Sequence, residues 1–128
     1  MSHTLKGQLS NRILKQINPV RASFASKIAA LNATDCYTPE QKAVFVAHEE
    51  YLYSVAVQMY AQYVQDVIDT ALLAYPEAPV VVALNALKAL VAAYAAVPAG
   101  SDASAEHQAV VDYADHLADD LQSIEVPY

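Results

Sequence analysis

Apolar side chains recur every three or four residues through the first quarter of the chain, which is the spacing of one face of an amphipathic helix. Pro19 falls inside this stripe, and Asn18-Pro19 has the form of an N-cap followed by a proline in the first helical turn. The pattern predicts a basic N-terminal helical segment within residues 1–33. It is expected either as two nearly collinear pieces, at about 4–17 and 19–33, or as one kinked helix. The stripe consists of Leu5, Leu9, Ile13, Ile17, Val20, Phe24, Ile28 and Leu31.

The residues that follow predict one long central helix. In Thr38-Pro39-Glu40-Gln41, Thr38 is the cap, Pro39 takes the first helical position, and Gln41 completes a capping box. No glycine or proline follows until Pro76, so the predicted helix spans 39–75. It would be roughly 55 Å long at 1.5 Å per residue. Because a compact domain of this size has a radius of gyration of only about 14 Å, the helix must bend or the protein must be elongated.

Prolines and a glycine mark the bounds of two further helices. Pro76 and Pro79 flank a turn, after which an alanine-rich helix is predicted over 79–97. The sequence from Pro98 to Ser101 ends it, and an acidic helix is predicted over 102–124, capped by Ser101 or Asp102. Residues 126–128 are expected to form an irregular tail. These segments predict a single all-α domain over 1–128, an antiparallel bundle of about four helical segments.

Two of the predicted helices have less polar surface than an ordinary surface helix requires. In the 39–75 helix the polar residues fall on one narrow stripe, and tyrosines and valines cover most of the remaining circumference, Tyr53 and Tyr60 among them. In the 79–97 helix, Asn85 and Lys88 are the strongly polar interior positions. A bundle of this size can surround about one helix completely, so two such helices predict contact with a further partner. Self-association is the favoured interpretation.

Charge is distributed unevenly along the chain. The net charge is −7, yet all five charged residues before Asp35 are cations, and the rest of the chain has two cations and fourteen acids. In the favoured interpretation, the basic segment docks on the acidic last helix of its own subunit or of a neighbouring one. In the alternative, it faces outward toward nucleic acid or an acidic protein. The cations are Lys6, Arg12, Lys15, Arg21 and Lys27, and the principal acids of the last helix are Asp112, Asp115 and Asp119.

The histidines and carboxylates suggest a metal site only weakly. His48-Glu49-Glu50 begins like the helix of a zinc protease, but Leu52 occupies the position of the second histidine. His107, Asp112, His116 and Glu49 are the set that a helical bundle could bring together around a metal. A solvated acidic face is the favoured interpretation of the aspartates, so no metal, cofactor or catalytic residue is assigned.

Other chemistry is sparse. Gly7 and Gly100 are the only glycines, which excludes the glycine-rich loops that bind phosphates. Cys36 is the only cysteine, so no internal disulfide can form and a reducing, intracellular setting is favoured. The first ten residues lack the apolar core of a signal peptide, and Asn85 and Lys88 interrupt the one long apolar run. The expected location is the cytoplasm, or a virion if the protein is viral, without a membrane span.

The sequence therefore favours a non-enzymatic helical protein that self-associates and acts through protein–protein binding, as a structural subunit or as an inhibitor or adaptor. Its small, Ala/Val/Tyr-rich helical character would suit a phage-encoded or accessory bacterial protein. The alternatives are a nucleic-acid-associated protein that uses the basic segment and a His/carboxylate bundle metalloprotein. Candidate interaction residues are Lys6, Arg12, Lys15, Arg21, Tyr53, Tyr60, Asp112, Asp115 and Asp119.

Overall fold

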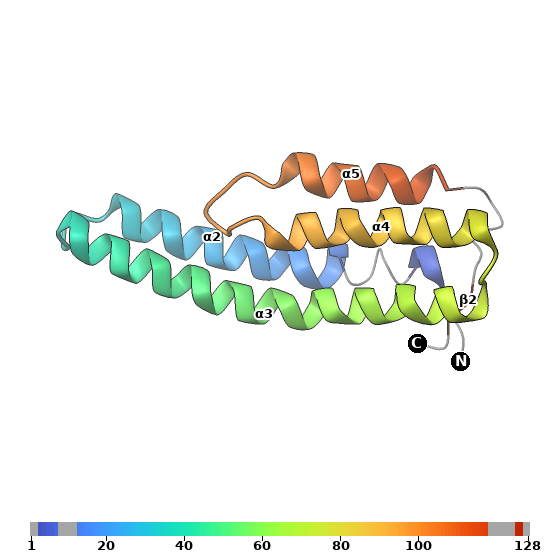
Figure 1. Cartoon of the computed structure of the whole chain (residues 1–128). Helices are drawn as coiled ribbons and strands as arrows, with labels where there is room; N and C mark the ends of the chain where they lie inside the picture. The colour runs from blue at the N-terminus through green and yellow to red at the C-terminus, as the bar shows by residue number, and fades with distance from the viewer. Residues whose placement is uncertain (1–2, 8–12, 118–124, 127–128) are drawn as a thin grey trace.

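The helices follow one another as an antiparallel bundle (Figure 1). A computed structural model of the chain describes residues 3–7, 13–117 and 125–126. Residues 5–7 are helical, and a short antiparallel pairing joins the strands β1 (His3–Thr4) and β2 (Glu125–Val126). The elements between them are η1 (Ile13–Ile17, a π-helix), α2 (Asn18–Ala33), α3 (Pro39–Ala74), α4 (Ala78–Ala96) and α5 (Ser104–Asp115).

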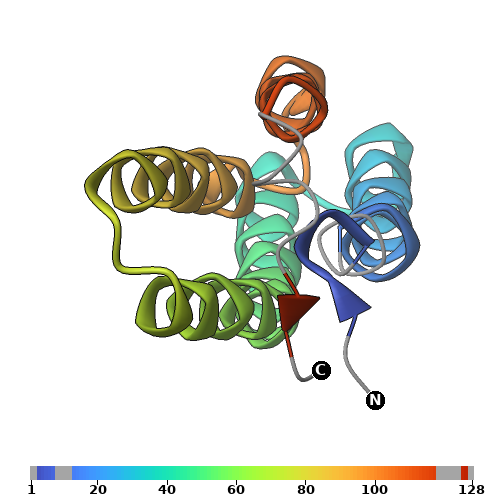
Figure 2. The same cartoon turned by 90° about the vertical axis from the view of Figure 1, so that its right-hand side faces the viewer.

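Each helix packs against its neighbour in sequence, α2 on α3, α3 on α4, and α4 on α5. Figure 2, which looks along the bundle, places α5 above and between α2 and α4. The all-α antiparallel bundle predicted from the sequence is thus confirmed.

The long helix α3 begins as its capping box predicts. Gln41 N–H donates to the Thr38 hydroxyl at 3.2 Å, and Thr38 N–H donates to the Gln41 side chain at 2.9 Å. The helix then runs without a break for 36 residues. Figure 1 shows that the α2–α3 hairpin extends past the turn between α4 and α5. Of the two shapes that the length of α3 allowed, the protein therefore adopts the elongated one.

The N-terminal segment differs from its prediction in two places. Asn18 does not cap α2, because the preceding Ile17 already has helical angles (φ −71°, ψ −45°) and no side-chain cap forms. The π-turn η1 carries the chain directly into α2, and Pro19 falls in the first turn, where its missing N–H is tolerated. The Asn18 side chain is thereby free for tertiary contacts. Thr4, predicted to be helical, instead lies in β1.

The last helix and the tail also differ from their predicted bounds. Helix α5 begins at Ser104 rather than at residue 102, and its N-cap residue is Ala103. Asp102 is still used at this start, since its carboxylate accepts the Ser104 N–H at 2.9 Å. The helix ends at Asp115, so His116 and Leu117 are not helical as predicted, and residues 118–124 of the predicted helix lie outside the described residues. Val126 is not part of an irregular tail, because it pairs with His3 in the β1–β2 register.

The core runs along the inner faces of α3 and α4. Helix α4 contributes the buried residues Leu84, Leu87, Val91 and Tyr94. The length and apolar composition of α4 would also allow it to cross a membrane. The core helix of a soluble protein can have the same length and composition. From α3 the main buried residues are Tyr53, Val57, Val64, Val67 and Ile68.

Candidate functional site

Arg21 holds the turn between α4 and α5 against α2. The turn itself is closed by a hydrogen bond of 3.1 Å from Ser101 N–H to the Pro98 carbonyl. The Arg21 guanidinium donates to three carbonyls near this turn, those of Val97 (3.0 Å), Pro98 (2.6 Å) and Ser101 (3.1 Å). It also donates to the Tyr53 hydroxyl at 2.7 Å. One side chain thus links α2, α3 and the α4–α5 turn.

Glu50 holds the same turn from α3. Its two carboxylate oxygens accept the N–H groups of Ala99 and Gly100, each at 2.8 Å. Glycine fits here because a Cβ at position 100 would lie 3.1 Å from the Glu50 carboxylate and 3.3 Å from Ile28. Arg21 therefore donates to the carbonyls of the turn, and Glu50 accepts from its N–H groups. The turn is held by two side chains of opposite charge.

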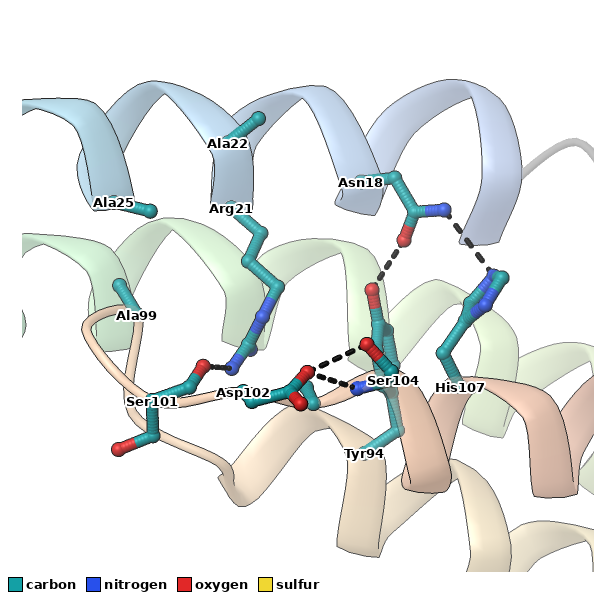
Figure 3. A pocket seen from close by; sticks show the side chains of 11 residues that line it. Asn18, Arg21, Ala22, Ala25, Tyr94, Ala99, Ser101, Asp102, Ser104 and His107 are labelled. Carbon is teal, nitrogen blue, oxygen red and sulfur yellow. Dashed lines mark hydrogen bonds between the residues drawn. The ribbon is translucent and has the colours of Figure 1, made fainter.

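An open pocket of about 320 Å³ lies beside this turn, between α2 and the start of α5 (Figure 3). Figure 3 shows that Asn18 and Arg21 reach into it from α2, while His107 approaches from α5. The polar or ionisable side chains that line it are those of Asn18, Arg21, Tyr94, Ser101, Asp102, Ser104 and His107.

A chain of hydrogen bonds crosses one end of the pocket. The Tyr94 hydroxyl donates to the side-chain oxygen of Asn18, and the Asn18 amide nitrogen lies 3.2 Å from Nε2 of His107. When that amide donates, the neutral imidazole carries its proton on Nδ1. Burial raises the pKa of the Tyr94 hydroxyl, with Arg21 opposing the effect, so the phenol remains a donor at neutral pH.

Ser104 and Asp102, which line the pocket, are not arranged for nucleophilic catalysis. Asp102 accepts both the N–H and the hydroxyl of Ser104, and these bonds lower the pKa of the Asp102 carboxyl. A catalytic serine would instead donate to a histidine that an acid orients. Here Ser104 donates to Asp102 and His107 pairs with Asn18. These polar groups satisfy one another, which indicates a network that joins helices.

The basic segment meets the acidic last helix at one described ion pair. Nζ of Lys6 lies 3.1 Å from the Asp115 carboxylate, and both side chains are about half exposed, 45% and 50%. Lys15 is exposed on η1, whereas Arg21 points inward. Arg12 and Asp119 lie outside the described residues.

The other candidate interaction residues are divided between core and surface. Tyr53 is only 2% exposed, and Tyr60 is half-buried against the core. Tyr53 therefore packs inside the protein, whereas Tyr60 keeps part of its surface in solvent. Asp112 is exposed and accepts a hydrogen bond of 2.6 Å from Gln108.

The candidate metal ligands are not brought together. Within the described ranges, no three His, Cys, Asp or Glu side chains gather closely enough to hold a metal ion. His107 pairs with Asn18, and the ring of His116 turns back to the Asp112 carbonyl at 2.7 Å. Glu49 lines a different open pocket, together with Lys27 and Tyr37.

Large apolar side chains cover the outer side of α3. Between residues 43 and 65 the only charged residues are Glu49 and Glu50, and Glu50 is turned inward onto the α4–α5 turn. The exposed side chains are between 38% and 66% accessible to solvent. We call this surface the α3 outer face; it consists of Val44, Phe45, Tyr51, Leu52, Val55, Met59 and Tyr63.

Comparison of the chain with models of protein families, with curated proteins and with solved structures finds no match. Function must therefore be inferred from the pocket and from the α3 outer face.

Sequence reasoning missed the residues that hold the α4–α5 turn. The helical wheel puts Glu50 on the narrow polar stripe of the 39–75 helix, and Arg21 is predicted only as one cation of the basic segment. A wheel gives the direction of a side chain but not the segment that it meets. Nothing in the sequence distinguished Glu50 from the other residues of that stripe. For Asn18 the local signal favoured a cap, and nothing in the sequence indicated Tyr94 and His107 as its partners.

Proposed function

We propose that this protein is a non-enzymatic helical subunit that self-associates and acts through protein–protein binding, as a structural subunit or as an inhibitor or adaptor. The observation that carries the proposal is the α3 outer face. Its seven large side chains are on average about half exposed. They present on the order of 700 Å² if each large side chain offers roughly 200 Å² when fully exposed.

A surface of this kind is unusual for a protein that works alone. A monomer rarely exposes a contiguous apolar patch of more than a few hundred Å², and larger patches mark interaction sites. The chain carries a net charge of −7, so it has enough charged residues to make such a helix face polar. The acids of α3 nevertheless lie elsewhere, at Glu40, Glu49, Glu50, Asp66 and Asp69, and leave the 51–63 stretch uncharged.

The alternative roles have less support. The pocket beside the α4–α5 turn has polar groups that bond to one another, which favours a structural role over catalysis. For nucleic-acid binding, the cations should be free to meet phosphates. Arg21 donates instead to four neutral oxygens, and Lys6 pairs with Asp115.

The test is the solution mass of the intact protein, measured by light scattering and sedimentation over a concentration series at low and high salt. We expect a defined oligomer that persists at high salt, because apolar burial is not screened. Val55→Glu on the α3 outer face should shift it to monomer. Val82→Glu makes the same change at an exposed position of α4 and is the matched control. A wild-type monomer at every concentration would remove self-association from the proposal.

A further inference from the structure

We infer that the α3 outer face binds the same face of a second copy of this chain, with the two α3 helices antiparallel around a two-fold axis at Val55. This inference rests on the proposed function and specifies its partner and geometry. The pairing would turn two α2–α3 hairpins into a four-helix assembly. It would cover the α3 outer face, which α2 and α4 leave exposed to solvent.

The spacing of the exposed residues fits a helix of the same sequence. They repeat every seven residues, in the rows Phe45, Leu52, Met59 and His48, Val55, Gln62, with Val44, Tyr51, Gln58 beside them. His48, Gln58 and Gln62 are exposed as well. The row Phe45, Leu52 and Met59 is wholly apolar, and an apolar repeat of seven residues lets two helices stay in contact over their length. A second copy necessarily has a matching repeat.

The charges on α3 favour the antiparallel arrangement. Beyond Tyr63, the helix carries Asp66 and Asp69, and Asp69 forms an ion pair of 2.7 Å with Lys88. A parallel, in-register pair would place Asp66 of one copy beside Asp66 of the other, and like charges brought together across an interface are unfavourable. In an antiparallel pair, the aspartates of the two copies lie at opposite ends of the interface.

The same arrangement separates the acidic α4–α5 halves of the two copies. It also places Tyr51 of one copy opposite Met59 of the other, and contacts between a thioether and an aromatic ring are favourable.

The area of the α3 outer face is close to the area that a stable pair buries on each partner. A typical specific interface buries about 800 Å² on each partner. The α3 outer face offers on the order of 700 Å² by the same side-chain measure used above. His48, Gln58 and Gln62 extend the contact.

Disulfide cross-linking between single-cysteine variants tests both the partner and the direction. The exposed Cys36 is first replaced, by Cys36→Ser, so that each variant has one thiol. Val55→Cys, His48→Cys and Gln62→Cys are then oxidised singly, and the last two are also mixed. Around an axis at Val55, two copies of residue 48 would lie about 21 Å apart along the helix, at 1.5 Å per residue. A disulfide needs Cα atoms within about 7 Å.

We expect Val55→Cys to cross-link to itself, and His48→Cys to cross-link to Gln62→Cys only in the mixture. Self-cross-linking of the 48 and 62 variants would mean a parallel pair, and would overturn the inference while the proposed function stands. A dimeric mass without any of these cross-links would place the interface elsewhere and would also overturn only the inference. A monomeric mass would overturn the inference and the proposed self-association together.

Discussion

Replacing Arg21 by methionine should cost about 3 kcal/mol of stability. The methionine keeps an unbranched apolar stem but removes all the donors of the guanidinium. Of the four acceptors, the carbonyls of Pro98 and Ser101 are in exposed contacts where water can take over, whereas the Tyr53 hydroxyl and the Val97 carbonyl are partly buried. A buried polar group left without its partner costs about 1–3 kcal/mol. The Tyr53 hydroxyl and the Val97 carbonyl therefore determine the loss of stability.

The assay is urea and thermal unfolding followed by far-UV circular dichroism, at a protein concentration held constant across variants. For a chain of this length, a loss of about 3 kcal/mol lowers the Tm by roughly 10 °C. Lys15→Met removes the same charge from an exposed side chain, so its effect should stay within about 0.5 kcal/mol. Arg21→Lys keeps the charge but not the planar fork, and should fall between the two. A loss below about 1 kcal/mol for Arg21→Met would refute the role of Arg21 in holding the turn.

Two further predictions concern Gly100 and the buried tyrosines. Gly100→Ala places a Cβ 3.1 Å from the Glu50 carboxylate, which weakens the Glu50 hydrogen bonds to the turn. It should lower the free energy of unfolding by about 1 kcal/mol in urea, a loss that an unchanged midpoint would contradict. Burial raises the pKa of the Tyr53 and Tyr94 hydroxyls above the usual phenol value, so the stability they contribute holds below about pH 10 and falls as the pH rises through their folded pKa values. Ultraviolet titration of the native protein should show these two phenols ionising after the exposed ones, and simultaneous ionisation of all nine tyrosines would argue against it.

Local signals in the sequence determined most of the helical framework. The capping box at Thr38 and the absence of glycine and proline up to Pro76 predicted α3 to within one residue at its C-terminal end. Such signals succeed because capping and apolar periodicity act between residues a few positions apart. The same signals failed to predict the start of α2 in the N-terminal segment. Asn18 there has the local form of an N-cap, yet the π-turn η1 leads directly into α2. The Asn18 side chain is therefore not used as a cap.

Tertiary structure decided what the polar side chains do. Arg21 and Glu50 meet at a turn that lies 76 and 49 residues farther along the chain, counted to Val97 and Ala99. No periodicity encodes a contact between segments so far apart. A wheel of α3 showed a surplus of apolar residues but not which of them would be buried. That division depends on α2 and α4, which pack against the opposite side of the long helix and leave Val55 and its neighbours in solvent.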